Sequence, residues 1–284
     1  MLLKTSDINQ VKNIFKKFVL PKSDSHKGQN GKVLIIGGSS LFHAASLWAA
    51  EVCSHFVDMV HYSSTVENEK IFHELKKIFR NGIIVPQKNL DHYINEDDVI
   101  LLGPGMMRDG EEGEYTRTLT KKLIEKFPEK KFVIDAGALQ MMDREWLKNL
   151  KTPPILTPHE KEFESLFGIK GNETTVFEMA KKHRSVILLK KIQDIISDGK
   201  AIYVIEGGNA GLTKGGTGDV LAGLTASFLA KNSGLYTCVF ASVLLKTTSD
   251  KLFETSGYWY NIDDIIKSLP RVLAELCPGL DSGF

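Results

Sequence analysis

Short unbroken runs of Val, Ile and Leu recur along this chain and alternate with longer segments of helical periodicity. An unbroken apolar run of four or five residues is typical of a strand buried on both faces of a parallel sheet. Alternation of such strands with helices predicts a doubly wound α/β sandwich, with a central, mainly parallel sheet flanked by helices. The predicted strands are Val33–Ile36, Val57–Tyr62, Gly82–Val85, Val99–Leu102, Phe132–Ile134, Ile155–Leu156, Val186–Leu189, Ile195–Ser197 and Ala201–Ile205.

The segments between these strands have helical periodicity. The N-terminus predicts an amphipathic helix, because Ile8, Val11, Ile14, Phe15 and Phe18 fall on one face. Residues 197–200, Ser-Asp-Gly-Lys, form a turn signal between two adjacent strands, which predicts an antiparallel hairpin near one edge of the sheet. The other predicted helices are Ala44–Phe56, Lys70–Phe79, Gly113–Lys126, Arg144–Asn149, Lys161–Phe167, Phe177–His183, Val220–Lys231 and Leu235–Thr255.

The composition favours one soluble domain over residues 1–284. The net charge of +1 gives no electrostatic basis for binding nucleic acid or a membrane surface. No apolar run approaches the roughly 20 residues of a membrane span. Cys53, Cys238 and Cys277 are scattered and form no metal-binding motif, which indicates a reducing compartment. We therefore expect a cytoplasmic protein with no nucleic-acid or membrane partner.

Residues 207–223, GGNAGLTKGGTGDVLAG, contain the clearest chemical signal in the chain. Gly215, Gly216 and Gly218 precede a predicted helix, and glycine permits positive φ and close backbone approach. Backbone N–H groups that converge there, together with the positive end of a helix dipole, favour an anion such as a phosphate.

Asp219 places one carboxylate inside this turn. A negative charge does not help phosphate affinity, so its position predicts a base that takes a proton from a hydroxyl attacking a phosphoryl group. The alternative is that Asp219 only caps the helix. We favour the base, because a cap does not require three glycines before it.

Polar and glycine-rich loops follow five of the predicted strands. In open α/β sheets, ligands bind at the carboxyl ends of the strands, so these loops predict one long groove. His159 is the only histidine among them, and its alternative role is to fasten its own loop. The five loops span residues 37–40, 103–106, 135–139, 157–162 and 190–191.

These motifs occur in the order seen in the ADP- or ATP-dependent NAD(P)H-hydrate dehydratases, which the chain resembles over residues 26–255. The family has a ribokinase-like fold, a three-layer sandwich, and repairs NADH or NADPH that has been hydrated on the nicotinamide ring. From the length we expect the stand-alone dehydratase, without the epimerase domain that many members carry. The motifs are HKGQNGKVLIIGGSS (26–40), LLGPGM (101–106), VIDAGAL (133–139), LTPHEKEF (156–163), LLK (188–190) and residues 207–223.

The resemblance implies a role for several residues. Asp219 matches the catalytic aspartate and also contacts the substrate. Ala45, Gly105 and His159 match positions that contact the hydrated dinucleotide, with His159 expected away from the 215–218 turn. The nucleotide, ADP or ATP, is expected at Gly215, Gly216, Thr217, Gly218, Lys190, Lys191, Ile192, Gln193 and Asp194.

The resemblance also implies Mg²⁺ and a homo-oligomer. Asp135 and Glu162 are the carboxylates expected to position the metal, through water. The small-molecule partner is hydrated NADH or NADPH, and the sequence does not discriminate between them or between ADP and ATP.

The chain departs from the family pattern at Ala44, Gly137, Lys191 and Ala210. The family has glycine where Lys191 stands, so this side chain either crowds the adenine or adds a phosphate contact. Two other functions stay open at this point. One is a ribokinase-like kinase for a sugar or vitamin alcohol, which would stop at the phosphorylated product. The other is a nucleotide-binding paralogue that has lost turnover.

Overall fold

The computed structural model describes residues 1–277, and within them ten strands form a single sheet. The strand order is β1-β10-β9-β8-β7-β6-β5-β2-β3-β4, and only β9 runs antiparallel to its neighbours. The strands are β1 (Leu2–Lys4), β2 (Lys32–Ile36), β3 (Met59–Ser63), β4 (Ile83–Ile84), β5 (Val99–Leu102), β6 (Lys131–Ile134), β7 (Ile155–Leu156), β8 (Val186–Leu189), β9 (Asp194–Ser197) and β10 (Ile202–Glu206).

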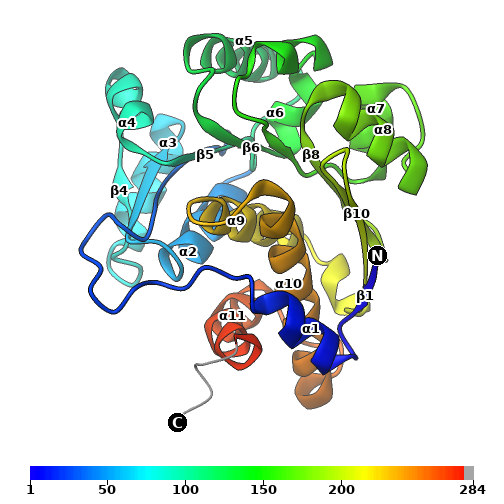
Figure 1. Cartoon of the computed structure of the whole chain (residues 1–284). Coiled ribbons are helices and arrows are strands. Elements are labelled where there is room, and N and C mark those ends of the chain that lie inside the picture. The colour runs from blue at the N-terminus through cyan, green and yellow to red at the C-terminus, as the bar shows by residue number, and fades with distance from the viewer. Residues whose placement is uncertain (278–284) are drawn as a thin grey trace.

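Helices cover both faces of this sheet, which confirms the predicted three-layer α/β fold (Figure 1). Successive residues of β2 face opposite layers: Val33 and Ile35 belong to one apolar core, and Leu34 and Ile36 belong to the other. One face is covered by α1 (Ile8–Phe15), α2 (Ala44–Ser54), α3 (Val66–Leu75), α9 (Thr217–Leu229), α10 (Gly234–Ser256) and α11 (Ile262–Leu276).

The opposite face carries the second core, and a shorter set of helices packs on it. Its helices are α4 (Leu90–Glu96), α5 (Gly110–Lys126), α6 (Ala136–Met141), α7 (Glu160–Phe167) and α8 (Glu173–His183). The remaining helical elements of residues 1–277 are three 3₁₀ turns: η1 (Gln87–Asn89), η2 (Arg144–Asn149) and η3 (Ala210–Thr213).

The hairpin predicted near one edge is confirmed, because β9 and β10 pair antiparallel. The structure adds β1 outside β10, a strand that the sequence analysis missed. With only three residues, β1 is too short for a periodicity signal, yet Leu3 is fully buried. Helices α4, α6 and α11 were also missed.

Helix α9 is the central helix of its layer, with ten of its residues buried. It packs against α2 and α10 (Figure 1). It begins at Thr217, three residues before the predicted start, so Asp219 lies inside its first turn. Among residues 1–277, no helix combines the length and the apolar character that crossing a bilayer would need.

Candidate active site

The strand order brings the predicted loops to one edge of the sheet. Strands β2, β5, β6, β7 and β8 are parallel neighbours, so the loops at their carboxyl ends lie next to one another. The loop after β5 packs closely on the loop after β6. A Cβ added at Gly103, in the first loop, would lie only 1.8 Å from the backbone oxygen of Asp135, in the second. An isolated parallel β-bridge between His159 and Lys190 joins the loop after β7 to the loop after β8.

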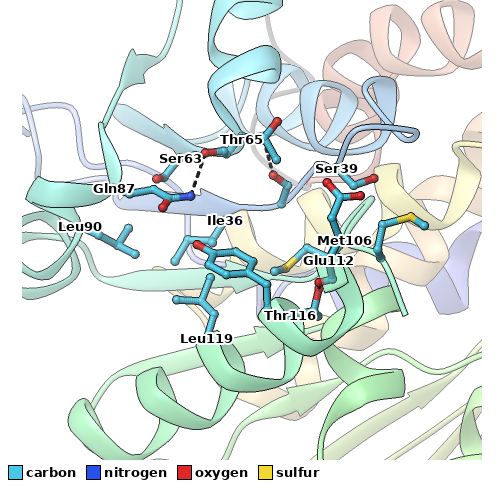
Figure 2. Close-up of a pocket in the computed structure, with 15 residues that line it drawn as sticks. Ile36, Ser39, Ser63, Thr65, Gln87, Leu90, Met106, Glu112, Thr116 and Leu119 are labelled. Atoms are coloured by element: carbon cyan, nitrogen blue, oxygen red, sulfur yellow. Dashed lines mark hydrogen bonds between the residues drawn. The ribbon is translucent and has the colours of Figure 1, made fainter. Parts of the chain in front are cut away.

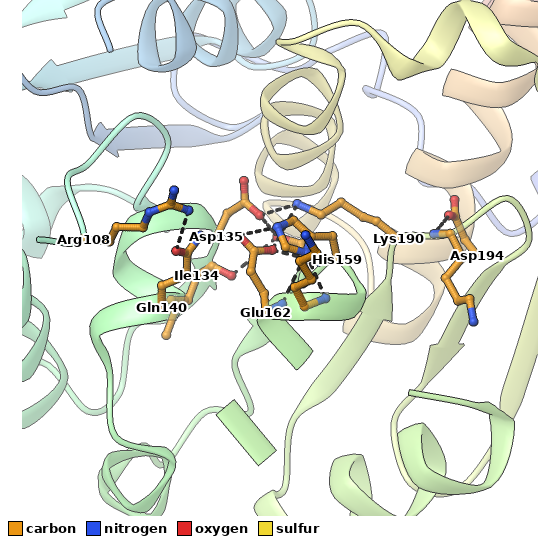
Figure 3. A network of polar contacts seen from close by, with 11 residues as sticks. Arg108, Ile134, Asp135, Gln140, His159, Glu162, Lys190 and Asp194 are labelled. Atoms are coloured by element: carbon orange, nitrogen blue, oxygen red, sulfur yellow. Dashed lines mark hydrogen bonds and ion pairs between the residues drawn. The ribbon is translucent and has the colours of Figure 1, made fainter. Parts of the chain in front are cut away.

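Lys190 lies at the centre of a buried charge network on this edge (Figure 3). Its Nζ is 2.8 Å from Oδ1 of Asp135 and 4.0 Å from Oε2 of Glu162. The hydroxyl of Thr157 donates to the same Asp135 oxygen at 2.7 Å. Burial disfavours the ammonium, but Asp135 and Glu162 outweigh burial and hold the pKa of Lys190 above its ordinary value.

Asp135 and Glu162, expected to position Mg²⁺ through water, form no direct metal site with other side chains in the described part of the chain, and their contact through water stays a prediction. Within residues 1–277, no three His, Cys, Asp or Glu side chains are grouped to hold a metal. The ammonium of Lys190 lies beside both carboxylates, where a cation would have to bind. Glu162 is also engaged, because it accepts hydrogen bonds from Gln140 Nε2 and from the backbone N–H of His159, both at 2.8 Å.

Gly215 and Gly216 precede α9, whereas Gly218, which was expected before the helix, is its second residue. Gly216 is the N-cap residue with φ +102°, and a Cβ there would lie 2.6 Å from the Trp48 ring and 2.9 Å from Ile262. Gly215 borders open space, and Gly218 has helical geometry with Lys190 Nζ 3.5 Å from its hypothetical Cβ. The need for positive φ therefore lies at Gly216 alone.

The N–H groups of a first helical turn have no acceptor within the helix. In α9 the N–H of Thr217 donates to the carbonyl oxygen of Lys214 at 3.3 Å, whereas within residues 1–277 no backbone acceptor is seen for that of Gly218. Among the described residues, the hydroxyl of Thr217 is also buried without a hydrogen-bond partner. A buried polar atom without a partner is rare in folded proteins. Both features favour an anionic ligand at this end of α9.

Asp219 occupies the third position of α9, so it does not cap the helix; Gly216 does. Burial raises the pKa of Asp219 to about 7, and the negative charge of Asp135 adds to this effect. Lys190 opposes the shift. A carboxylate with a pKa near neutrality is well matched to general-base work at physiological pH.

A cavity of about 660 Å³ adjoins this turn. Several residues predicted to hold a nucleotide line it, whereas Gln193, Gly215 and Gly216 do not. Lys191, a departure from the family pattern, pairs with Glu160 at 2.7 Å. The lining includes Lys190, Lys191, Ile192, Asp194, Thr217 and Gly218, together with Lys246, which the sequence analysis did not single out.

His159 is the N-cap of α7, a structural role that the sequence analysis held as the alternative. Its Nδ1 accepts hydrogen bonds from the backbone N–H groups of Lys161 and Glu162 at 3.1 and 3.2 Å. Its side chain is 47% exposed, so the imidazole remains accessible to a ligand. It lines the same cavity as Gly218, rather than lying away from the 215–218 turn as we expected.

Ala45 and Gly105 meet at the next part of the edge. A Cβ at Gly105, where φ is +72°, would lie 3.1 Å from the Ala45 Cβ and 2.8 Å from the Phe42 carbonyl oxygen. Gly137 is equally confined, since a Cβ there would lie 2.1 Å from the Met106 carbonyl oxygen. This explains why a side chain is disfavoured at Gly137.

A small hollow of about 40 Å³ lies beside this region (Figure 2). It is bounded by the loop after β2, by Met106 and by α5, from which Glu112 extends toward Ser39 (Figure 2). Glu112 accepts hydrogen bonds from the backbone N–H and hydroxyl of Ser40, at 3.1 and 2.7 Å. No sequence motif marks Glu112, because its role depends on a contact 72 residues away.

The fold is that of a ribokinase-like protein, and at this edge a glycine turn at the start of α9 lies beside one carboxylate of raised pKa. A ribokinase-like superfamily protein from Enterococcus faecalis has the same fold, with a TM-score of 0.80 and 25% identity over 94% of this chain and 95% of that one. The ADP/ATP-dependent NAD(P)H-hydrate dehydratase of Bacillus subtilis, co-crystallised with ATP and Mg²⁺, shares the fold with a TM-score of 0.76 at 20% identity; the match covers 95% of this chain and 97% of that one.

The family model described as NAD(P)H-hydrate dehydratase matches residues 33–271. The ADP-dependent (S)-NAD(P)H-hydrate dehydratase of Cenarchaeum symbiosum is 30% identical over 91% of this chain and 94% of its own length. The bifunctional NAD(P)H-hydrate repair enzyme of Methanocaldococcus jannaschii is 33% identical over 95% of this chain and 57% of its own length. The chain belongs to the NAD(P)H-hydrate dehydratase family, and it spans about half the length of the bifunctional relatives it matches.

Replacing Gly216 by Ala should lower the free energy of unfolding by about 1–3 kcal/mol, because a Cβ is strained at positive φ and collides with Trp48. Gly215→Ala is the matched control and should change stability by less than about 0.5 kcal/mol, since open space surrounds that position. Urea unfolding measures both. Equal losses in the two variants would contradict the distinct role of Gly216.

The raised pKa of Asp219 makes stability depend on pH. An unfolded Asp ionises near pH 4, so between about pH 4 and pH 7 the folded protein binds more protons than the unfolded chain. The contribution of Asp219 to stability therefore falls as pH rises through this window. Asp219→Asn should gain stability relative to wild type between pH 4 and pH 8, measured by denaturant unfolding. A difference that is constant with pH would refute this.

Proposed function

We propose that this protein dehydrates hydrated NADH or NADPH back to the reduced cofactor at the expense of ADP or ATP. The observation that carries this proposal is Asp219, a carboxylate of pKa about 7 within the first turn of α9, beside the glycine turn. Family membership supports the choice of substrate, since the relatives that the chain covers almost end to end are named ADP-dependent (S)-NAD(P)H-hydrate dehydratases.

The proposed chemistry begins with a phosphoryl transfer. Asp219 takes the proton of the ring hydroxyl, the hydroxyl oxygen forms a bond to the terminal phosphorus of the nucleotide, and the bond from that phosphorus to the bridging oxygen breaks. Hydroxide is a poor leaving group, whereas phosphate is a good one. The ring C–O bond then breaks, phosphate departs, and a proton leaves the neighbouring ring carbon to give the double bond of the nicotinamide.

The residues of the edge divide this work. Thr217, Gly218 and the N–H groups of the first turn of α9 would bind the phosphates, and Lys190 would offset the charge that develops there. Ala45, Gly105 and His159 would contact the dinucleotide. Any Mg²⁺ would be held mainly by nucleotide phosphates and water, because Asp135 and Glu162 are already paired with Lys190. The homo-oligomer and the cytoplasmic location remain predictions from the sequence.

The direct test incubates the whole protein with hydrated NADH or hydrated NADPH and with ADP or ATP, each pair separately. Recovery of the absorbance of the reduced nicotinamide, with release of one phosphate per turnover, is the expected result. Nucleotide consumption with a phosphorylated small alcohol as the product would support the kinase alternative instead. No recovery with any of the four pairs would overturn the proposal.

Asp219→Asn should abolish this turnover while nucleotide affinity changes less than about threefold, because an amide keeps the size of the side chain but accepts no proton near neutral pH. The wild-type rate should fall as pH is lowered through about 7, when Asp219 becomes protonated. Calorimetry and steady-state kinetics measure the two effects. A variant that retains most of its activity would remove Asp219 from the role of base.

The two roles of His159 can be separated with two substitutions. Asn is a good N-cap residue, so His159→Asn should keep α7 intact, whereas His159→Ala should cost about 0.5–2 kcal/mol of stability. Both variants lose the imidazole and should raise the KM for the hydrated dinucleotide at least several-fold; because His159 also lines the 660 Å³ cavity, the nucleotide KM is measured beside it. An Asn variant with a normal dinucleotide KM would leave His159 with the capping role alone.

A further inference from the structure

Helix α10 contains one buried ammonium that the proposed chemistry does not use. Lys246 is 5% exposed and follows Val243, Leu244 and Leu245, which are also buried. Placing an isolated charge in such surroundings costs several kcal/mol unless it is paired and hydrogen-bonded. The contacts of Lys246 must therefore offset that cost.

The ammonium of Lys246 joins two separate segments of backbone. Its Nζ donates to the carbonyl oxygen of Ile192 at 2.8 Å and lies 3.5 Å from that of Lys191, both in the loop after β8. It also donates to the carbonyl oxygen of Gly207 at 3.4 Å, in the turn after β10. Both segments line the 660 Å³ cavity, and so does Lys246 itself.

Asp194 completes the arrangement from the start of β9. It is buried and lies 3.6 Å from Lys246 Nζ. Its other contacts are the hydroxyl of Ser242, at 2.7 Å, and the backbone N–H of Lys191, at 2.9 Å. Burial raises the pKa of Asp194, and Lys246 acts against this rise. The carboxylate of Asp194 is thus committed to holding the loop, which distinguishes it from a residue that contacts a ligand directly.

Helix α10 fastens the opposite wall of the cavity as well. Asp250 accepts a hydrogen bond from the backbone N–H of Gly208 at 3.1 Å, and Asn209 donates to the carbonyl and hydroxyl oxygens of Ser249 at 2.9 and 2.8 Å. Lys246 contacts both walls of the cavity, because its ammonium donates to the carbonyl oxygen of Ile192 in one wall and to that of Gly207 in the other.

We propose that Lys246 is a positioning residue that holds the loop 190–194 against the turn at Gly207 and so sets the affinity for the nucleotide. This inference rests on the proposed function, because it takes the cavity as the nucleotide site. Without the ammonium, two carbonyl groups and the Asp194 carboxylate lose their shared partner. The loop then has to be ordered by the nucleotide itself, which weakens binding.

The test measures binding of ADP and of ATP to the whole protein by calorimetry, with no hydrated dinucleotide present. Lys246→Met should weaken nucleotide binding about tenfold, because it keeps the length of the side chain and removes the charge. Lys251→Met is the matched control: it removes the same charge from the same helix, at a partly exposed pair with Glu275, and should leave affinity unchanged. Kinetics should show a higher nucleotide KM with an unchanged KM for the hydrated dinucleotide.

Lys246→Met also removes the cation beside the buried Asp194 carboxylate, which lowers the stability of the single variant independently of any effect on the nucleotide. The double variant Lys246→Met, Asp194→Asn removes both charges and should recover thermal stability but not nucleotide affinity. Wild-type affinity in a folded double variant would overturn the inference, as would an equal rise in the KM of both substrates. A wild-type protein that binds neither ADP nor ATP would instead overturn the proposed function, and this inference with it.

Discussion

The ion pair between Lys190 and Asp135 is the interaction on which the rest of the site depends. The two side chains follow β8 and β6, with β7 between them, so the pair ties together three neighbouring strand ends. Burial is the main cause that raises the pKa of Asp219 to about 7; the negative charge of Asp135 adds to this rise and the ammonium of Lys190 opposes it. Without the ammonium, the repulsion between the carboxylates of Asp135, Glu162 and Asp219 at this edge would lose the cation that offsets it.

The layers of the fold could be predicted from the sequence, because strands buried on both faces cannot alternate polar and apolar residues. Val99–Leu102 and Val186–Leu189 show this directly, since the predicted and observed ranges agree. The edge of the sheet expected to carry the site followed from the loops at the carboxyl ends of the strands, and the hairpin of β9 and β10 followed from the turn signal at residues 197–200. The three-residue β1 and the six-residue α6 could not be predicted, because neither is long enough to show a period.

The roles of single residues were harder to predict, because they depend on contacts between distant segments. Gly216 needs to be glycine on account of Trp48 and Ile262, which lie on other helices, and nothing in the run 215–218 distinguishes it from Gly218. Asp194 belongs to the segment expected to bind the nucleotide, yet its carboxylate is directed at Ser242 and Lys246. A motif identifies the segment that forms a site, whereas the partner of each side chain is set by packing.

The burial of α9 connects these observations. The residues that follow its first turn pack on every side, and Gly223 lets α2 approach closely, since a Cβ there would lie 3.0 Å from the Ala49 carbonyl oxygen. A helix held in this way presents its first turn at a fixed place, so its N–H groups need no reorganisation to meet an anion. Asp219 is carried on the same turn and therefore has a fixed position relative to that anion. The 190–194 loop contains no helical turn of its own, and its backbone and the Asp194 carboxylate are instead held by Lys246 and Ser242 of α10 on that side of the cavity.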